Sequence, residues 1–493
     1  MSATGVTRRP RPYRPETRVE TAAARPASAW SMIKAYFLDF KVLKDCPREF
    51  WVIQAINLLD CLAYFAFLNI GVVFLSETVG FSDVSAGYVF TVFTTTVTLL
   101  LFFSGFVTDW LGIRRSVHVA MALLVLTRGG IAICGFFPGV PHREALMWAL
   151  FLLLAPGTAM VQTLFQSAVR RYTSPRARGA GFSMWYLVMN IGAALGGIAI
   201  DVVRLNFRAD NTWIVNIGVV TAVLCSLLTV LFIRSEAQAA TAGEAPQAGE
   251  AQPADRRLPW QILGEVVRQS TFWRFLVLVS CLIGVRAVFL YMALLSPKYW
   301  LRVIGPDAPM GLFQAVNPIL IVVGLILFIP LANKFNVYSM LVFGGIISSL
   351  SLFALVVPWK WMGADIVAAY TTMTMISLVV LSIGEIIWSP KLQEYTAAVA
   401  PAGQEGSYLG MSLMPYFLAK TFISLVSGHL LTRFCPEGIR PRIESGTLPF
   451  WSSPEAMWLL LGGFALLGIL MALLFRGWLT KGVKLDPEPR SAA

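Results

Sequence analysis

Apolar runs of about 20 residues, separated by short polar segments, recur along the whole chain. An α-helix needs a run of about this length to cross the roughly 30 Å hydrocarbon core of a bilayer. The pattern therefore predicts an all-α membrane protein. Twelve transmembrane helices are expected, at residues 50–76, 84–108, 117–136, 146–167, 180–201, 212–233, 272–296, 311–332, 337–357, 366–390, 407–432 and 455–476.

One low-complexity segment divides these spans into two groups of six. It reads SEAQAATAGEAPQAGEAQPAD, a composition that cannot bury an apolar core. Two equal bundles are the arrangement expected of a transporter whose halves rock about a site at the bilayer midplane. We predict a mostly disordered cytoplasmic segment at 1–45, a six-helix bundle at 46–234, a cytoplasmic linker at 235–270, a second six-helix bundle at 271–478 and a cytoplasmic tail at 479–493.

The composition agrees with a membrane protein. With 57% hydrophobic residues, 13% charged residues and a mean hydropathy of +0.68, the chain is too apolar for a soluble domain. Arg and Lys cluster in the N-terminal segment, the loops after the second and fourth spans, the linker and the tail. All of these fall on one side of the membrane, which the positive-inside rule makes cytoplasmic. We expect a multi-pass protein of the cell (inner or plasma) membrane with both termini in the cytoplasm.

The net charge of +12 is explained by the basic residues of the predicted cytoplasmic side. It does not indicate nucleic-acid binding, because these basic residues are not interleaved with aromatic residues on a soluble face. The six cysteines are scattered singly without metal-ligand spacing. The three histidines lie far apart in the sequence, and the chain has neither a nucleophile motif nor a phosphate loop. We therefore expect no enzyme activity, no metal and no cofactor.

A specific motif lies in the predicted cytoplasmic turn between the second and third spans. The stretch GFVTDWLGIRRS carries Gly105, Asp109, Gly112, Arg114 and Arg115. It resembles the signature loop of the major facilitator superfamily, G-x-x-x-D-x-x-G-x-R-R, at every fixed position. Glycine lets neighbouring helices approach, and an Asp flanked by Arg residues can make charge-assisted contacts between helix ends. The resemblance implies a conformational lock at the cytoplasmic side.

Three further stretches resemble the proton-coupled oligopeptide transporter family. They are GFSMWYLVMNIGAALGG at 181–197, FQAVNPILIVVGLILFIPL at 313–331 and GEIIWSPKLQEYTAAVAPAGQEGSYLGM at 384–411. That family has an aromatic-rich N-x-G helix, a Q-x-x-N-P helix and a G-E-x-x-x-S-P helix in this order. The resemblance implies that Glu385 and Asn317 face a central cavity and hold the positively charged amino end of a solute. Lys420 is an alternative partner for Glu385.

The first half departs from that family. Its usual E-x-x-E-R pattern is replaced by NLLDC, which keeps one acid as Asp60 and places Asn57 at the start. The lysine that the family carries on the fourth span is replaced by Gln162. Both cations with which the family holds a peptide carboxylate are therefore missing.

Two other cations lie within the apolar spans, Arg128 and Arg286. A charge near the bilayer centre costs about 2.5–3.5 kcal/mol on insertion scales, so such residues usually face a partner or a wet cavity. Either arginine could hold an anionic solute group or neutralise a carboxylate. We hypothesise that Asp60 and Arg286 pair and separate during a transport cycle; a permanent structural pair is the alternative.

Proton coupling requires a carboxylate that can gain and lose a proton in a buried site, and Asp60 and Glu385 are the candidates. Arg128, Arg286 and Lys420 are the cations that could control them. Helical spacing places Gln54, Asn57 and Tyr64 on one face of the first span, where they are expected to line the cavity. Asn190 is a further candidate, whereas Gly192 and Gly196 follow a small-xxx-small pattern that favours close helix packing.

These observations predict a secondary active transporter that works by alternating access. The solute is expected to be peptide-like or amine-bearing, imported together with protons through the lipid bilayer by a monomer. The alternative is a facilitator superfamily transporter of a drug, an organic anion or a nucleoside, acting as an importer or an exporter. A receptor-like scaffold that has lost transport is a further possibility.

Overall fold

A computed structural model describes residues 40–174, 176–234, 268, 270–332, 336–362, 365–399 and 414–481. The predicted N-terminal segment up to residue 39, most of the linker (235–267) and the tail from residue 482 lie outside the described residues. Within the described ranges the chain forms helices and turns without a β-strand.

Six long helices make up the N-terminal half: α2 (Arg48–Val73), α3 (Asp83–Leu111), α4 (Ile113–Phe136), α5 (Arg143–Tyr172), α6 (Arg178–Asp201) and α7 (Thr212–Phe232). The short 3-10 helix η1 (Phe40–Asp45) precedes them. Two of the long helices are extended by a π-helical turn, α2 by η2 (Phe74–Val79) and α6 by η3 (Val202–Asn206).

The C-terminal half contains α10 (Ser270–Cys281), α11 (Ile283–Leu294), α12 (Ser296–Val303), α13 (Met310–Ala332), α14 (Val337–Leu350), α15 (Ile366–Val399), α17 (Met414–Phe434) and α19 (Pro454–Leu474). The predicted seventh span, 272–296, corresponds to the two helices α10 and α11, and α12 follows it. Shorter elements connect the others: η4 (Ser351–Leu355), η5 (Trp359–Met362), α18 (Arg440–Glu444), η6 (Phe450–Ser452) and α20 (Arg476–Leu479).

Every predicted span coincides with a helix of the described chain. Nine of these helices are long and apolar enough to cross a membrane, and the bent pair formed by α10 and α11 makes a tenth. The two remaining spans correspond to α13, whose described apolar part is the shorter Met310–Gly324, and to α17. Large apolar side chains such as Leu99, Leu231 and Leu474 are exposed, as expected of positions that lipid covers in a membrane.

The seventh span is bent within the predicted range and followed by a second break. The axes of α10 and α11 differ by 43° across Leu282. A second break follows α11, where Pro297 lies in the first turn of α12 and supplies no backbone N–H. Near this break the side chain of Gln314 donates from Nε2 to the carbonyl oxygen of Met292, in the last turn of α11, at 2.6 Å.

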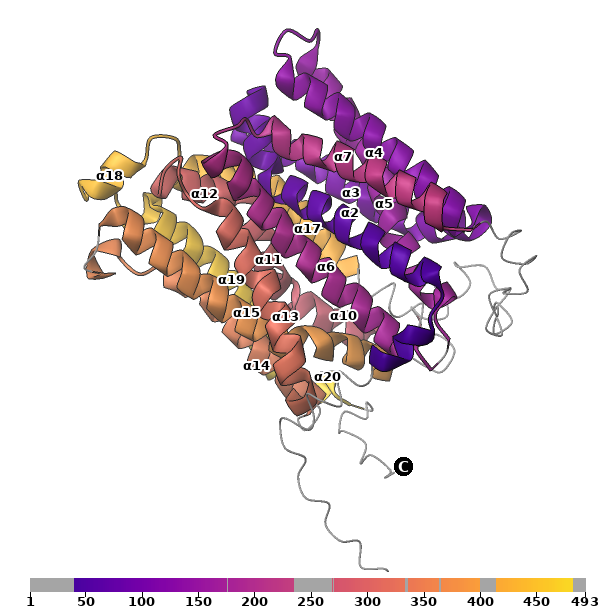
Figure 1. The fold of residues 1–493 in the computed structure, drawn as a ribbon. Coiled ribbons are helices and arrows are strands. Elements are labelled where there is room, and N and C mark those ends of the chain that lie inside the picture. Colours follow the sequence, from indigo (N-terminus) through magenta and orange to yellow (C-terminus); the bar gives the residue numbers. More distant parts are fainter. Residues whose placement is uncertain are drawn as a thin grey trace, which may run out of the picture.

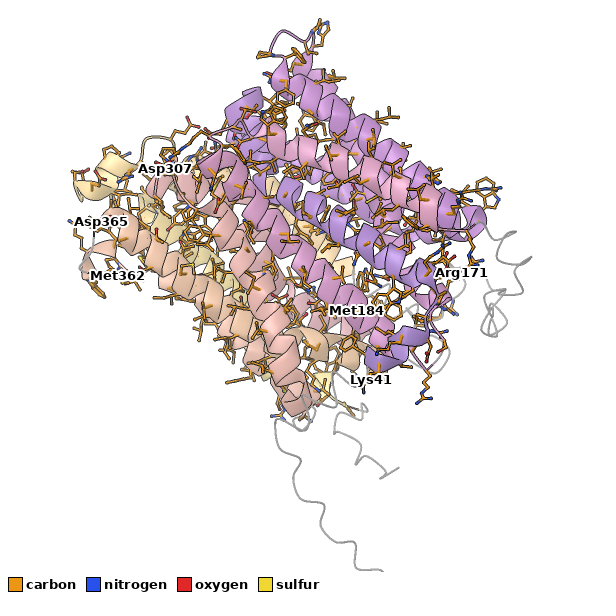
Figure 2. All side chains as sticks on the ribbon, in the orientation of Figure 1. Lys41, Arg171, Met184, Asp307, Met362 and Asp365 are labelled. Carbon is orange, nitrogen blue, oxygen red and sulfur yellow. The ribbon has the colours of Figure 1, made fainter. Side chains whose placement is uncertain are left out.

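The two halves form bundles that lie side by side, with α6 next to α13 and α3 next to α17 (Figure 1). Lys41 and Arg171 mark one end of the molecule, and Asp307 and Asp365 mark the other (Figure 2). We call these the inner end and the outer end. The inner end contains the described parts of the segments for which the sequence predicts a cytoplasmic location, such as the turn between α3 and α4.

Near the outer end the bundles touch backbone to backbone. A Cβ atom added to Gly311 of α13 would lie 2.1 Å from the carbonyl oxygen of Gly197 in α6. A Cβ atom added to Gly428 of α17 would lie 2.5 Å from the carbonyl oxygen of Asp83 in α3. Only glycine fits such contacts, so these positions bring the bundles together at the outer end.

Candidate functional site

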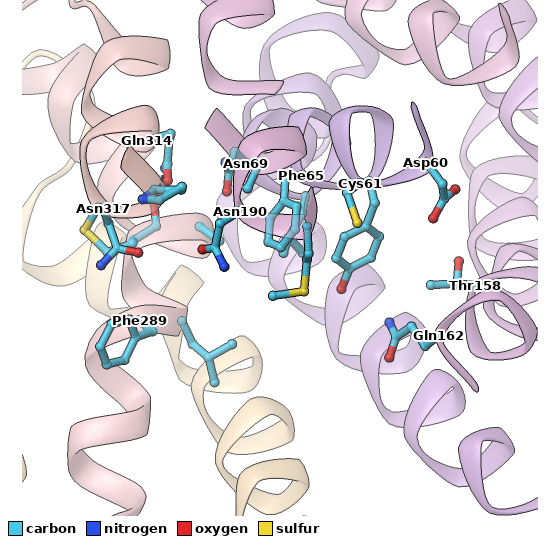
Figure 3. A pocket seen from close by; sticks show the side chains of 18 of the residues that line it. Asp60, Cys61, Phe65, Asn69, Thr158, Gln162, Asn190, Phe289, Gln314 and Asn317 are labelled. Carbon is cyan, nitrogen blue, oxygen red and sulfur yellow. Dashed lines mark hydrogen bonds between the residues drawn. The ribbon is translucent and has the colours of Figure 1, made fainter. Parts of the chain in front are cut away.

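A cavity of about 440 Å³ lies between the two bundles (Figure 3). Its walls come from α2 to α6 on one side and from α11, α13, α15 and α17 on the other. The volume falls in the range of small-molecule sites, and the lining combines aromatic side chains with a limited set of polar groups.

The cavity brings together all the residues that the sequence suggested for solute binding and coupling, with one exception. The lining includes Asn57, Asp60, Tyr64, Arg128, Gln162, Asn190, Arg286, Asn317, Glu385 and Lys420. The exception is Gln54, which is buried in α2 but does not line the cavity. Helical spacing predicts which residues share a face of a helix but not how far a cavity extends along that face. The cavity does not extend as far as Gln54.

A carboxylate with its own amide partner forms one pole of the site. Asn317 of α13 donates from Nδ2 to Oε2 of Glu385 in α15 at 2.8 Å and to Oγ of Ser382 at 3.1 Å. Since the amide nitrogen makes these bonds, the carbonyl oxygen of Asn317 is the atom left to face a ligand. Glu385 therefore has Asn317 as a hydrogen-bond partner, and the alternative pairing with Lys420 stays a prediction. A carboxylate and a carbonyl oxygen together suit a donor such as an ammonium group.

An arginine lies close to this pole. The guanidinium of Arg286, in α11, lies over the ring of Trp388 with 5.0 Å between Cζ and the ring centroid. Arg286 is also close enough to Glu385 for their charges to interact. Cation–π stacking holds the guanidinium at the edge of the cavity while keeping its charge.

A buried ion pair forms the second pole, within the N-terminal bundle. Nη2 of Arg128 in α4 lies 3.6 Å from Oδ1 of Asp60 in α2. Nη1 of Arg128 also donates to the carbonyl oxygen of Gly218 in α7 at 3.2 Å. In this conformation Asp60 pairs with Arg128, and the predicted pairing of Asp60 with Arg286 during a transport cycle stays a prediction. Arg128 faces α2 from inside the same bundle, whereas Arg286 belongs to the opposite wall.

Neutral side chains connect α2 and α6 along the N-terminal wall. Asn57 donates from Nδ2 to the carbonyl oxygen of Trp185 at 3.2 Å and accepts from the thiol of Cys61 at 3.3 Å. Gly192 and Gly196 pack directly on the α2 backbone, as their spacing predicts, because a Cβ atom on Gly196 would lie 2.6 Å from the carbonyl oxygen of Leu62.

Sequence reasoning missed several lining residues, among them Trp185, Tyr186, Phe289, Gln314 and Trp388. Trp388 follows Glu385 by three residues and so shares its helix face, a periodicity that would have found it. Phe289 relates to Arg286 in the same way. Aromatic residues within apolar spans give a weak signal, because most of them face lipid or the bundle core.

The loop motif predicted as a lock lies at the inner end. Gly112 joins α3 to α4 with a φ of 74°, a conformation that favours glycine. Arg114 and Arg115 lie in the first turn of α4 and are partly or fully exposed. The side chain of Asp109 lies outside the described part of the chain, so the lock stays a prediction.

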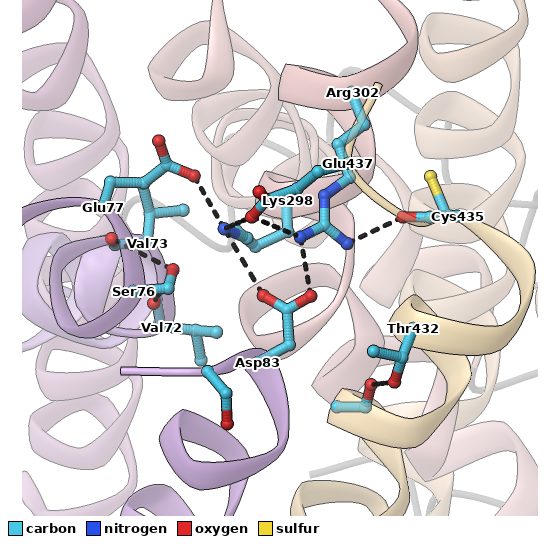
Figure 4. A network of polar contacts seen from close by, with 12 residues as sticks. Val72, Val73, Ser76, Glu77, Asp83, Lys298, Arg302, Thr432, Cys435 and Glu437 are labelled. Carbon is cyan, nitrogen blue, oxygen red and sulfur yellow. Dashed lines mark hydrogen bonds and ion pairs between the residues drawn. The ribbon is translucent and has the colours of Figure 1, made fainter. Parts of the chain in front are cut away.

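Ion pairs hold the bundles together at the outer end (Figure 4). Nζ of Lys298 in α12 lies 2.6 Å from Glu77 and 3.4 Å from Asp83 of the N-terminal bundle. Arg302, one turn further along α12, lies 2.6 Å from Asp83 and 3.3 Å from Glu437. Lys298 and Arg302 are buried, so these pairs close the cavity from the outer side.

A second contact closes the outer end between α6 and α13. The carboxylate of Asp201, the last residue of α6, accepts from the backbone N–H groups of Gly311 and Leu312 at 2.8 and 2.7 Å. Both groups lie in the first turn of α13, so a residue of one bundle caps a helix of the other. Arg204 adds donors to the carbonyl oxygens of Pro306 and Ala308.

Removing this cap should open the outer end. Replacing Asp201 by alanine leaves two helix N–H groups unsatisfied, which costs about 1–2 kcal/mol. We expect a roughly five- to thirtyfold shift of the equilibrium toward an outward-open state. Cys61 lines the cavity and reports this shift: a membrane-impermeant thiol reagent added from the outer side should label it faster in the variant, as peptide mapping would measure.

Asp365→Ala is the matched control, because Asp365 caps α15 within its own bundle by accepting from Val367 and Ala368. Its labelling rate at Cys61 should equal that of the wild-type protein. Equal rates for Asp201→Ala and the wild type would show that the cap does not hold the outer end closed.

Comparison with known proteins identifies the class. The family model of the Major Facilitator Superfamily matches residues 55–422. The chain therefore belongs to the Major Facilitator Superfamily, with twelve transmembrane helices in two six-helix bundles, as the sequence predicted. Its family and fold are those of transporters and not of enzymes.

Solved structures with the same fold include oligopeptide transporters. A peptide transporter POT in complex with sulfate has a TM-score of 0.65 and 17% identity, covering 89% of this chain and 96% of that one. The POT family transporter PepTSo has a TM-score of 0.65 and 14% identity, covering 88% and 99%. A POT family transporter in complex with 5-aminolevulinic acid has a TM-score of 0.65 and 14% identity, covering 88% and 97%. At this identity the similarity shows the fold alone. No curated protein sequence matches the chain significantly.

Proposed function

We propose that this protein is a secondary active transporter that imports a small amine-bearing or peptide-like solute together with protons. It works as a monomer in the cell membrane, with both termini in the cytoplasm. The observation that carries the proposal is the Glu385 carboxylate, held by Asn317 in a cavity between two bundles. A solute ammonium desolvated in that cavity needs a carboxylate and a neutral acceptor within reach.

The names of similar structures support this solute class. Among these structures, one shows a POT family transporter in complex with 5-aminolevulinic acid and one shows a POT family transporter in complex with a thioalcohol-conjugated peptide. Aminolevulinic acid carries an amine, as peptides do. The solute therefore enters this chain's cavity with its amino end toward Glu385.

Alternating access follows from the closed outer end. The pairs of Lys298 and Arg302 with Glu77 and Asp83 join the two bundles, and so does the Asp201 cap. These contacts must break for a solute to enter from outside. Lys298 and Arg302 are buried, so opening the outer end requires their charges to be hydrated again or to find new partners.

Proton coupling is assigned to Asp60 and Glu385. Each carboxylate lies in the cavity beside a cation, Arg128 for Asp60 and Arg286 for Glu385. A proton that neutralises one of them releases its cation or its ammonium ligand, which links the proton to the conformational cycle.

Uptake into liposomes tests the proposal. The purified protein is reconstituted, and uptake of dipeptides, simple amines, organic anions and nucleosides is measured with and without an inward proton gradient. We expect uptake of amine-bearing compounds that rises with the gradient and is absent from protein-free liposomes. Uptake of organic anions or nucleosides without uptake of amines would replace this proposal by the alternative solute class. A lack of uptake for every compound would favour a scaffold.

A further inference from the structure

The two walls of the cavity differ in charge. On the N-terminal wall the charged residues among the described lining are Asp60 and Arg128, and they form one ion pair. On the C-terminal wall they are Glu385, Arg286 and Lys420. The N-terminal wall therefore has no net charge. The charged lining residues outside the Asp60–Arg128 pair all belong to the C-terminal wall.

Arg128 is built into its bundle rather than presented to the cavity. Its side chain is 3% exposed and bonds to the carbonyl oxygen of Gly218 as well as to Asp60. Gly218 makes room for it, because a Cβ atom there would lie 2.9 Å from Cδ of Arg128. A solute anion that approached Arg128 would also meet the like charge of Asp60.

The rest of the N-terminal wall offers neutral hydrogen-bonding groups. They are the carboxamides of Asn57, Asn69, Gln162 and Gln166 and the hydroxyls of Tyr64 and Thr158. Carboxamides satisfy both donors and acceptors of an uncharged polar group. They do not neutralise a buried carboxylate, whose desolvation requires a cation.

We infer that the transported solute is charged only at the end that faces the C-terminal bundle and is uncharged at its far end. The class is an amine with a neutral polar or aromatic remainder, such as an amino-acid amide or a peptide amide, rather than an extended peptide with a free C-terminal carboxylate. The inference rests on the proposed function, because the amine end is the one that Glu385 holds.

A matched pair of ligands tests this. Alanyl-phenylalanine and its C-terminal carboxamide share the amine and the side chains and differ in the charge at the far end. Their dissociation constants for the purified wild-type protein are measured by isothermal titration calorimetry. We expect the carboxamide to bind at least tenfold more tightly than the acid.

Two variants should change this preference. Asp60→Asn removes the charge that cancels Arg128, so the acid should gain at least tenfold relative to the carboxamide. Gln162→Lys adds a cation to the N-terminal wall without disturbing the ion pair, and it should also strengthen binding of the acid relative to the carboxamide. This second variant keeps the test valid if Asp60→Asn fails to fold. Asp365→Asn is the matched control, because it makes the same Asp-to-Asn change at a helix cap outside the cavity and should leave the preference of the wild-type protein.

The outcomes separate two failures. If the wild-type protein binds the acid as tightly as the carboxamide, or more tightly, the inference about the far end is wrong while amine recognition stands. If neither compound binds but another class of solute does, recognition of an amine by Glu385 is wrong and this inference falls with it. A carboxamide preference that neither Asp60→Asn nor Gln162→Lys changes would also overturn it, since wall charge would not be its cause.

Discussion

Glu385→Gln should lose amine binding while keeping the fold. Glutamine has nearly the same shape as glutamate and can still bond with Asn317, but it has no charge for an ammonium. A hydrogen bond to a charged group contributes about 1.5–3 kcal/mol, which corresponds to a roughly ten- to hundredfold weaker Kd. Calorimetric titration with alanyl-phenylalaninamide measures the loss.

Thermal unfolding separates loss of binding from loss of structure. Removing a half-buried charge lowers the desolvation cost of the folded state, so Glu385→Gln should unfold at the wild-type temperature or above it. Ser382→Ala is the control: it deletes one partner of Asn317 but keeps the carboxylate, and we expect less than a fivefold change in Kd. Unchanged binding in Glu385→Gln would place the amine elsewhere in the cavity.

Arg128→Met should destabilise the protein strongly. Without Arg128 the carboxylate of Asp60, which is 8% exposed, keeps a buried charge without its cation. Breaking a buried pair by removing one partner costs about 3–5 kcal/mol. Thermal unfolding in detergent should show a clearly lower midpoint, and the proton-coupled uptake of a solute should fall with it.

A double variant shows whether Arg128 stabilises the protein by neutralising Asp60 or by the packing of its side chain. Asp60→Asn combined with Arg128→Met removes both charges, so most of the lost stability should return. Arg442→Met controls for the loss of an arginine as such, since Arg442 is exposed in α18 and should matter little. If the double variant is no more stable than Arg128→Met alone, Arg128 acts by packing rather than by neutralising Asp60.

The helices could be predicted because a bilayer imposes one rule on all of them. Each span must satisfy its own backbone and present apolar side chains to lipid, so length and hydropathy locate it without knowledge of the fold. The same rule assigns four charged residues to the cavity: Asp60, Arg128, Arg286 and Glu385. A charged side chain inside an apolar span is costly in contact with lipid, so it faces the interior between the helices.

The side-chain contacts between different helices could not be predicted in the same way. The contact of Asp60 with Arg128 depends on how α2 and α4 are rotated within one bundle, and the sequence gives no such rotation. The break after α11 is encoded locally by Pro297, but its consequence for Gln314 and Met292 depends on where α13 packs. Spacing within one helix carries no information about the facing helix.

The outer closure was missed for a related reason. The charged residues of this closure lie at or near the ends of spans, where charges are common and are expected to face water. They are Glu77, Asp83, Lys298 and Arg302. Their pairing depends on the distance between two bundles in one conformation of the cycle. The Asp201 cap is hidden in the same way, since its two N–H partners begin a helix more than a hundred residues away.

The central claim is that Glu385 and Asn317 recognise a solute amine, and one pair of ligands tests it most directly. Alanyl-phenylalaninamide and its N-acetyl derivative differ in the positive charge at the amino end and share the remainder. Titrated into the wild-type protein, the free amine should bind at least tenfold more tightly than the acetylated compound. Equal affinity for the two would contradict the account, because the carboxylate in the cavity would then have no part in recognition.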